Sequence, residues 1–99
     1  MSDNRILISP DPDLAEEATW YEGKLKEHLQ NALQAVEKLD NQYVQTIGHR
    51  IKGSAESFGF DKAGEIGKTL EFAAKENDTP AIKQALSLLA DYLDRIEIV

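Results

Sequence analysis

The sequence predicts an all-α fold, and specifically an antiparallel four-helix bundle. Four stretches of the 99-residue chain carry apolar side chains at spacings of three and four residues, the pattern of a helix that buries one face. Short connections separate the last three stretches, and such connections place neighbouring helices side by side and antiparallel. The chain contains no cysteine, so its core has to be held by apolar packing rather than by disulfides or thiolate zinc sites.

The first helix is predicted over residues 13–39. A cluster of Ser, Pro and Asp residues at positions 9–13 precedes it, and Asp13 and Glu16 have the spacing of a capping box. The side chains expected to face the core recur every three or four residues through the segment. They are Leu14, Ala18, Tyr21, Leu25, Leu29, Ala32, Val36 and Leu39.

The second and third helices are predicted over residues 41–58 and 61–77. The second follows Asp40 or Asn41 and stops at Gly59, a residue type that commonly ends helices in the left-handed conformation. Asp61 is the expected N-terminal cap of the third. The predicted buried residues are Val44, Ile47, Ile51, Ala55 and Phe58 in the second helix, and Ala63, Ile66, Leu70 and Ala73 or Ala74 in the third.

The fourth helix is predicted over residues 79–97. Thr79 followed by Pro80 is a strong start signal, because threonine caps helices and proline suits the first helical position. The terminal segments ILI (residues 6–8) and IEIV (residues 96–99) could either extend the core or pair with each other, and the sequence leaves this open. The buried residues of the fourth helix are expected to be Ile82, Ala85 or Leu86, Leu89, Leu93 and Ile96.

Composition and charge narrow the class of protein. The net charge of −7 disfavours nucleic acid and anionic membranes as partners. No apolar run is long enough to span a bilayer or to serve as a secretory signal, so we expect a cytoplasmic monomer with a single domain over residues 1–99. The only region without an acidic excess is residues 48–75, with five basic residues against four acidic ones.

A histidine occupies the outer side of the second helix in this region. Successive residues of a helix are about 100° apart, which places His49 about 160° from Ile51, the centre of the buried stripe. Gly53 and Glu56 lie on the same side as the histidine, and Lys52 lies on its flank. His49 is therefore predicted to be exposed to solvent, unlike a structural histidine that shares the apolar stripe.

Small residues surround this histidine. Gly53 costs a helix about 1 kcal/mol relative to alanine, and Gly48 and Ser54 are also small. We interpret these residues as a clearing that lets a large partner approach the imidazole. Lys52 is placed to supply a cation to an anionic group on the ring. Periodicity alone does not decide whether His49 is functional or is merely exposed to solvent.

The run GHRIKGSAESFGF at residues 48–60 resembles the signature of histidine-containing phosphotransfer (HPt) domains. In that signature a histidine, a spacer, an apolar residue, Lys-Gly, a small residue and a later glycine follow in order. The resemblance continues through DKAGEIGKTLEFAAKENDTPAIKQALSLLADYL and covers roughly residues 20–99. It is similar both to stand-alone bacterial members and to the phosphoacceptor domain of chemotaxis kinases.

The resemblance implies a role for each matching residue. His49 matches the histidine that is phosphorylated on Nε2, and Lys52 matches the lysine that contacts the phosphate. Gly53 matches the small residue that lets a partner close in. Glu71 matches a Glu or Gln that is hydrogen-bonded to the other nitrogen of the histidine. The residues that complete the expected phosphate site and docking surface are Arg50, Glu56, Lys68, Lys75 and Trp20.

The residue pattern supports the position of Glu71 independently. If Leu70 centres the buried stripe of the third helix, Glu71 lies about 100° away, on a flank that can face the second helix. A carboxylate bonded to Nδ1–H fixes the tautomer of a histidine and leaves Nε2 free as a nucleophile. The alternative is a solvated carboxylate that pairs with Lys68 or Lys75, worth a few tenths of a kcal/mol.

Three further side chains have weaker patterns. His28 lies next to Leu29 without a comparable clearing, which favours a partly covered structural histidine. Trp20 falls off the buried stripe and is either a docking anchor or a cap on the end of the bundle. Phe72 also points away from its stripe, and docking and incidental exposure are both open.

The resemblance implies a phosphoryl carrier rather than an enzyme. His49 would take a phosphoryl group from an aspartyl phosphate on one receiver domain and pass it to another, with response regulators and a hybrid histidine kinase as partners. We expect no intrinsic cofactor or metal site, and a divalent metal, magnesium, supplied by the receiver. No P-loop or glycine-rich phosphate loop is present in the sequence.

Two alternatives from other functional classes stay open. One is an acceptor domain that the ATP-binding domain of a histidine kinase phosphorylates directly, a reading that the glutamate at position 71 suits. The other is a helical interaction module whose histidine is never phosphorylated. Transfer of phosphate to His49 from a phosphorylated receiver is the observation that separates them from a relay carrier.

Overall fold

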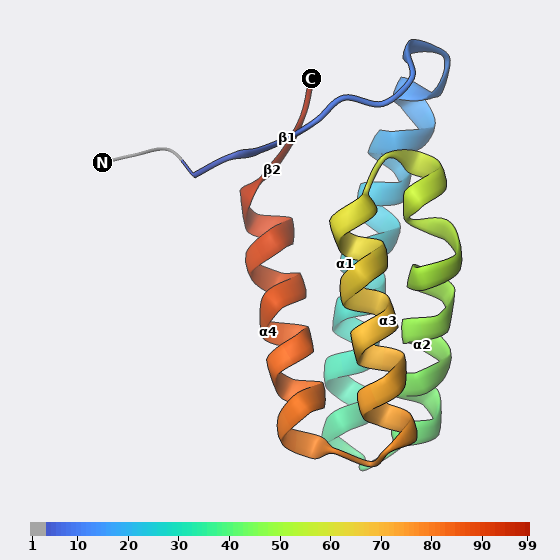
Figure 1. The fold of residues 1–99 in the computed structure, drawn as a ribbon, viewed down its shortest axis with the longest axis vertical. Coiled ribbons are helices and arrows are strands. Elements are labelled where there is room, and N and C mark those ends of the chain that lie inside the picture. Colours follow the sequence, from blue (N-terminus) through green and yellow to red (C-terminus); the bar gives the residue numbers. More distant parts are fainter. Residues whose placement is uncertain (1–3) are drawn as a thin grey trace.

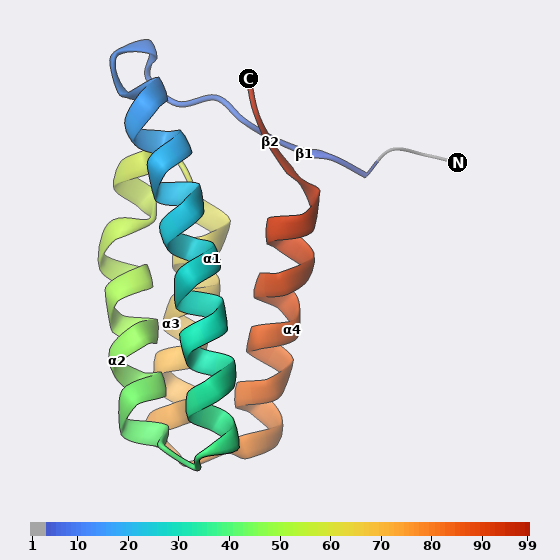
Figure 2. The same cartoon turned by 180° about the vertical axis from the view of Figure 1, so that it is seen from behind.

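The four predicted helices form an up-and-down bundle. The computed structural model describes residues 4–99, so the first three residues of the predicted domain lie outside the described part. The helices alternate in direction along the chain (Figure 1), which confirms the all-α, antiparallel architecture. Seen from behind, α1 lies in front of α3, with α2 and α4 on either side (Figure 2). The helices are α1 (Ala15–Glu37), α2 (Asn41–Ser54), α3 (Asp61–Lys75) and α4 (Thr79–Arg95).

The helix starts differ in detail from the predicted caps. Asp40 caps α2 by accepting a hydrogen bond from Tyr43 N at 3.1 Å, and Asp78 caps α4 by accepting one from Ala81 N at 3.1 Å. The prediction of Thr79 as the cap of α4 is therefore wrong by one residue. The aspartate is preferred because its carboxylate accepts hydrogen bonds more strongly than a hydroxyl and also favours the positive end of the helix dipole.

Two further predicted caps are wrong. Asp61 is the first residue of α3 and not its cap, and the residue in the cap position, Phe60, makes no side-chain capping bond. The capping box of Asp13 does not form either. Instead, a short 3-10 helix, η1 (Pro12–Leu14), precedes α1, and Asp11 accepts a hydrogen bond from Asp13 N at 3.0 Å.

All four helices end before the residue at which the sequence predicted their ends. α1 ends at Glu37, and Leu39 has a left-handed backbone (φ 58°) with an exposed side chain, so its assignment to the buried stripe is wrong. α2 ends at Ser54 and continues as a 3-10 turn, η2 (Glu56–Phe58). Gly59 then takes the left-handed conformation (φ 89°), as predicted. α3 ends at Lys75, and α4 ends at Arg95.

The core follows most of the predicted stripes, except that Leu14 is exposed and its assignment to the buried stripe is wrong. Two large residues are additional. Phe60 is completely buried although it stands outside any helix, and Tyr92 is buried on α4. The hydroxyl of Tyr92 has no hydrogen-bond partner among residues 4–99. Burial, with the nearby charges of Asp61 and Glu22, raises the pKa of Tyr92 to about 12.

The two terminal segments pair with each other, which settles the question that the sequence left open. Strand β1 (Ile6–Ile8) runs parallel to strand β2 (Ile96–Ile98), with Ile6 opposite Ile96 and Ile8 opposite Ile98. Ile8 and Ile96 are buried, so the ladder extends the core at the end of the bundle where α4 finishes (Figure 1). Within residues 4–99, no helix combines the length and the apolar character needed to cross a membrane.

Candidate functional site

His49 projects from the outer side of α2, as predicted. The side chains of Val44, Ile47 and Ile51 are buried against the rest of the bundle, so the opposite side of the helix faces solvent. The His49 side chain is 67% exposed. An exposed imidazole is accessible to a partner from outside the molecule.

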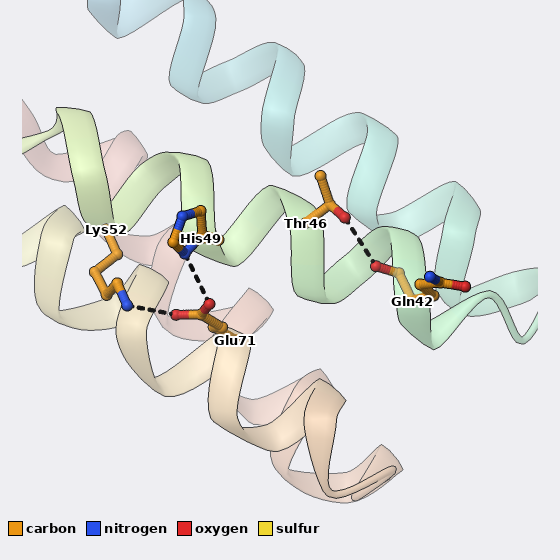
Figure 3. A network of polar contacts seen from close by, with 5 residues as sticks. All are labelled: Gln42, Thr46, His49, Lys52 and Glu71. Carbon is orange, nitrogen blue, oxygen red and sulfur yellow. Dashed lines mark hydrogen bonds and ion pairs between the residues drawn. The ribbon is translucent and has the colours of Figure 1, made fainter.

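Glu71 reaches this imidazole from the neighbouring helix. Its Oε2 lies 2.9 Å from His49 Nδ1, and the two side chains point toward each other across the α2–α3 boundary (Figure 3). The Glu71 side chain is only 21% exposed, much less than the histidine. The alternative pairing of Glu71 with Lys68 or Lys75 does not occur among the described residues.

Lys52 completes the group by binding the other oxygen of the carboxylate. Its Nζ lies 2.8 Å from Glu71 Oε1, so one carboxylate bridges an ammonium group and an imidazole (Figure 3). The hydrogen bond from Lys52 holds the pKa of Glu71 below its ordinary value, and the bond from His49 adds to this, while burial opposes it. Glu71 is therefore a carboxylate near neutral pH.

The ionisation of Glu71 determines which nitrogen of His49 carries a hydrogen. A carboxylate can only accept hydrogen bonds, so the nitrogen that faces it, Nδ1, must donate. In the neutral ring this leaves Nε2 with the free lone pair. Nε2 lies on the side of the ring turned away from Glu71 (Figure 3). The site therefore presents a nucleophilic nitrogen outward.

Two glycines hold α2 and α3 close enough for this contact. A Cβ on Gly48 would lie 2.6 Å from Glu71 N, and a Cβ on Gly67 would lie 2.8 Å from Lys52 N. Both distances are shorter than real Cβ atoms tolerate. The interpretation of Gly48 as part of a clearing for a partner is therefore wrong, because Gly48 is buried and serves the packing of the two helices.

Gly53 differs from these two glycines. A Cβ on Gly53 would meet no atom within 4 Å, so nothing inside the molecule requires a glycine at this position. Ser54 also has an internal role, because it donates to Arg50 O at 2.7 Å and shares a 2.6 Å hydrogen bond with the Tyr21 hydroxyl on α1. Only Gly53, of the three small residues, leaves open space beside His49.

The remaining predicted residues make no hydrogen bond or ion pair with His49 in the described part of the chain. Arg50 and Glu56 are exposed, and Lys68 and Lys75 are exposed on α3. Trp20 is 59% exposed on α1, with its ring centroid 6.2 Å from that of Phe58 and Lys24 Nζ 5.7 Å above the ring.

The second histidine is half-buried, in agreement with the prediction of a partly covered structural residue. Burial lowers the pKa of His28, and the charge of Arg50 lowers it further. His28 lies on α1, and its sequence neighbour Leu29 is in the core.

A small hollow beside His49 includes residues that the sequence analysis did not single out. Its volume is about 350 Å³, and Gln42, Gln45 and Thr46 line it together with His49 and Glu71. Gln42 and Thr46 precede His49 by seven and three residues, so helical spacing alone could have found them. No group of three His, Cys, Asp or Glu side chains suited to a metal ion occurs within residues 4–99.

Comparison with known proteins gives one match. The family model described as "Hpt domain" matches residues 17–98, which is most of the chain and includes every residue of the site. Neither the curated proteins nor the solved structures that were searched gave a match.

Proposed function

The chain belongs to the Hpt domain family, and we propose that it carries a phosphoryl group on His49 between receiver domains of a phosphorelay. Members of this family are histidine phosphotransfer modules that interact with receiver domains and histidine kinases. They are carriers and not catalysts. Beyond family membership, the proposal specifies the acceptor atom, the roles of the neighbouring residues and the type of partner.

The observation that carries the proposal is the orientation of the exposed imidazole. A phosphoryl acceptor needs an accessible lone pair, and the bond from Nδ1–H to Glu71 at 2.9 Å assigns that lone pair to Nε2. A histidine that served only solubility would need no such partner. While the bond holds, the carboxylate favours the tautomer with its hydrogen on Nδ1 and also limits rotation of the ring.

In the proposed step, the lone pair of Nε2 attacks the phosphorus of an aspartyl phosphate on the receiver. The bond between phosphorus and the aspartate oxygen breaks, and the aspartate leaves as a carboxylate. The new N–P bond places a positive charge on the ring, which keeps its Nδ1 hydrogen. The negative charge of Glu71, 2.9 Å away, stabilises that positive charge. Transfer to the second receiver reverses the same changes.

Lys52 is proposed to bind the transferred group. An ammonium group has three N–H donors, and the 2.8 Å contact to Glu71 Oε1 uses one of them. The others can donate to a phosphoryl oxygen on Nε2. Phosphoryl transfer has a loose transition state that depends on positioning and positive charge, so a lysine and a fixed imidazole are sufficient on this side.

The partner is expected to provide the remaining charge. Magnesium bound by the receiver would supply it, since the site itself offers a single carboxylate that is already bonded. An aspartate recessed in a receiver can be reached by a ring that protrudes from a convex bundle. The contact is expected to be small and transient, because a carrier must release each partner.

The sequence expectation of a stand-alone bacterial module, monomeric and cytoplasmic, forms part of this proposal. Direct phosphorylation by the ATP-binding domain of a kinase is the second candidate. It is favoured by the carboxylate at position 71, which stabilises the charged ring more strongly than a neutral amide would.

Phosphate transfer to the purified chain tests the proposal. The chain is incubated with a panel of phosphorylated receiver domains and, separately, with phosphoramidate, a small donor that needs no docking. We expect acid-labile, base-stable phosphate on His49 from at least one receiver, and none in the folded variant His49→Gln. Label from a kinase ATP-binding domain alone would support the second candidate. No label from any donor would leave an interaction module.

A further inference from the structure

A large groove lies along α3 and the adjoining part of α2, and the proposed chemistry uses only two of its lining residues, Lys52 and Glu71. Its volume is about 770 Å³. Phe72 lies in its lining and is 65% exposed, and Lys68 and Lys75 lie one turn before and one turn after it on the same side of the helix. We call these three residues the α3 surface. The groove is lined by Gln45, Lys52, Glu65, Lys68, Thr69, Glu71, Phe72 and Lys75.

The charges on the α3 surface have no counterpart within the described chain. Neither Lys68 nor Lys75 has a carboxylate within ion-pair distance among residues 4–99. The two acids in the groove are occupied, because Glu65 lies 3.8 Å from Lys62 and Glu71 binds Lys52 and His49. The α3 surface is therefore locally basic on a chain with a net charge of −7.

An exposed phenylalanine between two such lysines fits a particular kind of partner. Covering an exposed phenylalanine side chain removes apolar surface from water, so Phe72 offers a favourable contribution to binding that the isolated chain does not realise. Aromatic anchors flanked by charges are typical of specific protein contacts. The matching surface has an apolar recess with carboxylates on both sides.

The groove is continuous with the phosphoacceptor site. Lys52 and Glu71 line the groove and also form the contacts that orient His49. A partner seated on the α3 surface would therefore lie against this charged pair. Trp20, on α1, lies on a different helix and is not part of the groove.

We propose that Lys68, Phe72 and Lys75 form a docking surface for the receiver domain that exchanges phosphate with His49. The face of the receiver that binds there is expected to be apolar and acidic. This inference rests on the proposed function. The net charge disfavours nucleic acid and anionic membranes as the occupant. Two carboxylates on the surface of a protein can pair with both lysines at once, whereas a single small anion in an open groove cannot.

Transfer kinetics with matched variants test the docking surface. The receiver domain that labels the wild-type chain fastest is used with Lys68→Glu/Lys75→Glu, with Phe72→Ala, and with the control Lys83→Glu, a lysine on α4 outside the groove. We expect the rate constant for transfer to fall about tenfold or more in the double variant, and less at high salt. Phe72→Ala should slow transfer at any salt concentration, and Lys83→Glu should not.

Labelling by phosphoramidate separates this inference from the proposed function. It should be equal in the wild type, Phe72→Ala and Lys83→Glu, since it needs only His49 and its neighbours, and its rate in the double variant is the reference against which transfer from the receiver to that variant is compared. Normal transfer from the receiver to the double variant and to Phe72→Ala would overturn the docking surface while leaving the proposed function intact. Absence of wild-type labelling by every donor would overturn the proposed function instead. A wild-type dimer that Lys68→Glu/Lys75→Glu dissociates in sedimentation would make the occupant a second copy, which also overturns the inference.

Discussion

Gly48 lies directly against the backbone of Glu71, at a distance where a Cβ would come within 2.6 Å of Glu71 N. Gly48 immediately precedes His49, and Glu71 is the residue that binds His49. The packing of α2 on α3 and the geometry of the site are therefore set by the same contact. Gly67 repeats this relationship in the other direction, since its Cβ would lie 2.8 Å from Lys52 N.

The variant Gly48→Ala is expected to destabilise the protein and to disturb the site. Its methyl group meets backbone atoms that cannot rotate away, so α2 and α3 must separate, at a cost of about 1–3 kcal/mol. The free energy of unfolding from denaturant titration measures the loss. Gly23→Ala is the control, because a Cβ there meets nothing within 4 Å and should stabilise α1 by up to about 1 kcal/mol. Equal stabilisation by both variants would contradict the close approach.

Removing the carboxylate of Glu71 is expected to free the His49 ring. In Glu71→Ala, Nδ1 loses its acceptor at 2.9 Å, so the neutral ring should populate both tautomers. Nitrogen chemical shifts of the ring, measured by NMR, would change from one protonated and one unprotonated nitrogen toward averaged values. Phosphoramidate labelling should slow by about tenfold. Glu71→Gln keeps an oxygen acceptor and should retain the wild-type tautomer, which makes it the matched control.

The pKa of Glu71 gives a pH dependence with a definite sign. Lys52 and His49 hold the pKa of this carboxyl below 4.5 in the folded protein. The stability that these contacts contribute is therefore complete above the pKa of the unfolded chain and is lost as the pH falls through the lower folded value. The two partners of Glu71, His49 and Lys52, are exposed to solvent, which keeps the contribution small.

Carboxyl chemical shifts followed by NMR during an acid titration measure this pKa. We expect a midpoint below 4.5 for Glu71 in the wild type, and an increase in Lys52→Met, because the lysine is the larger cause. The increase in His49→Ala should be smaller. A midpoint that stays unchanged when Lys52 is replaced would show that the 2.8 Å contact does not persist in solution.

Helical periodicity was sufficient to predict the four helices and the exposed position of His49, because both depend on which side of one helix is apolar. The same reasoning placed Glu71 on the flank of α3 that faces α2. The sequence could not decide which lysine pairs with Glu71, since Lys52, Lys68 and Lys75 are all within plausible reach of its carboxylate. Only the relative position of α2 and α3 selects Lys52.

Features that depend on contacts between elements could not be predicted. Gly48 and Gly53 look alike in the sequence, because both are small residues close to His49. Their roles differ because α3 packs on Gly48 and nothing packs on Gly53. Phe60 follows the predicted end of a helix, so no periodicity marks it as buried. The pairing of β1 with β2 joins segments about 90 residues apart, a separation at which local patterns carry no information.

Tyr92 predicts an alkaline limit to stability. Its folded pKa of about 12 exceeds the ordinary value of 10.0, so the folded protein retains the hydroxyl proton after the unfolded chain has lost it. Stability should therefore fall between pH 10 and 12, by about 2–3 kcal/mol for two pH units. Tyr92→Phe should remove this decrease. At pH 7 it should cost less than about 1 kcal/mol or stabilise, because the buried hydroxyl has no partner in the described chain. A strongly destabilised Tyr92→Phe at pH 7 would mean that the hydroxyl is bonded.

Gly53→Ala separates folding from docking at the site. The added methyl meets nothing within 4 Å, so it should stabilise α2 by up to about 1 kcal/mol through helix propensity. The same methyl fills the open space beside His49 and should slow phosphate transfer from a receiver about tenfold, because a 1 Å displacement from in-line geometry is costly.

Two comparisons test whether the slower transfer to Gly53→Ala is an effect on docking. Phosphoramidate should label Gly53→Ala as fast as the wild type, because a small donor does not need the open space. Gly64→Ala on α3, where a Cβ would make only ordinary contacts from 3.9 Å, should leave transfer unchanged and is the control. Gly23 also meets nothing within 4 Å, so what distinguishes Gly53 is its place one turn after His49. Full transfer activity in Gly53→Ala, with its higher stability, would show that the partner approaches His49 from another direction.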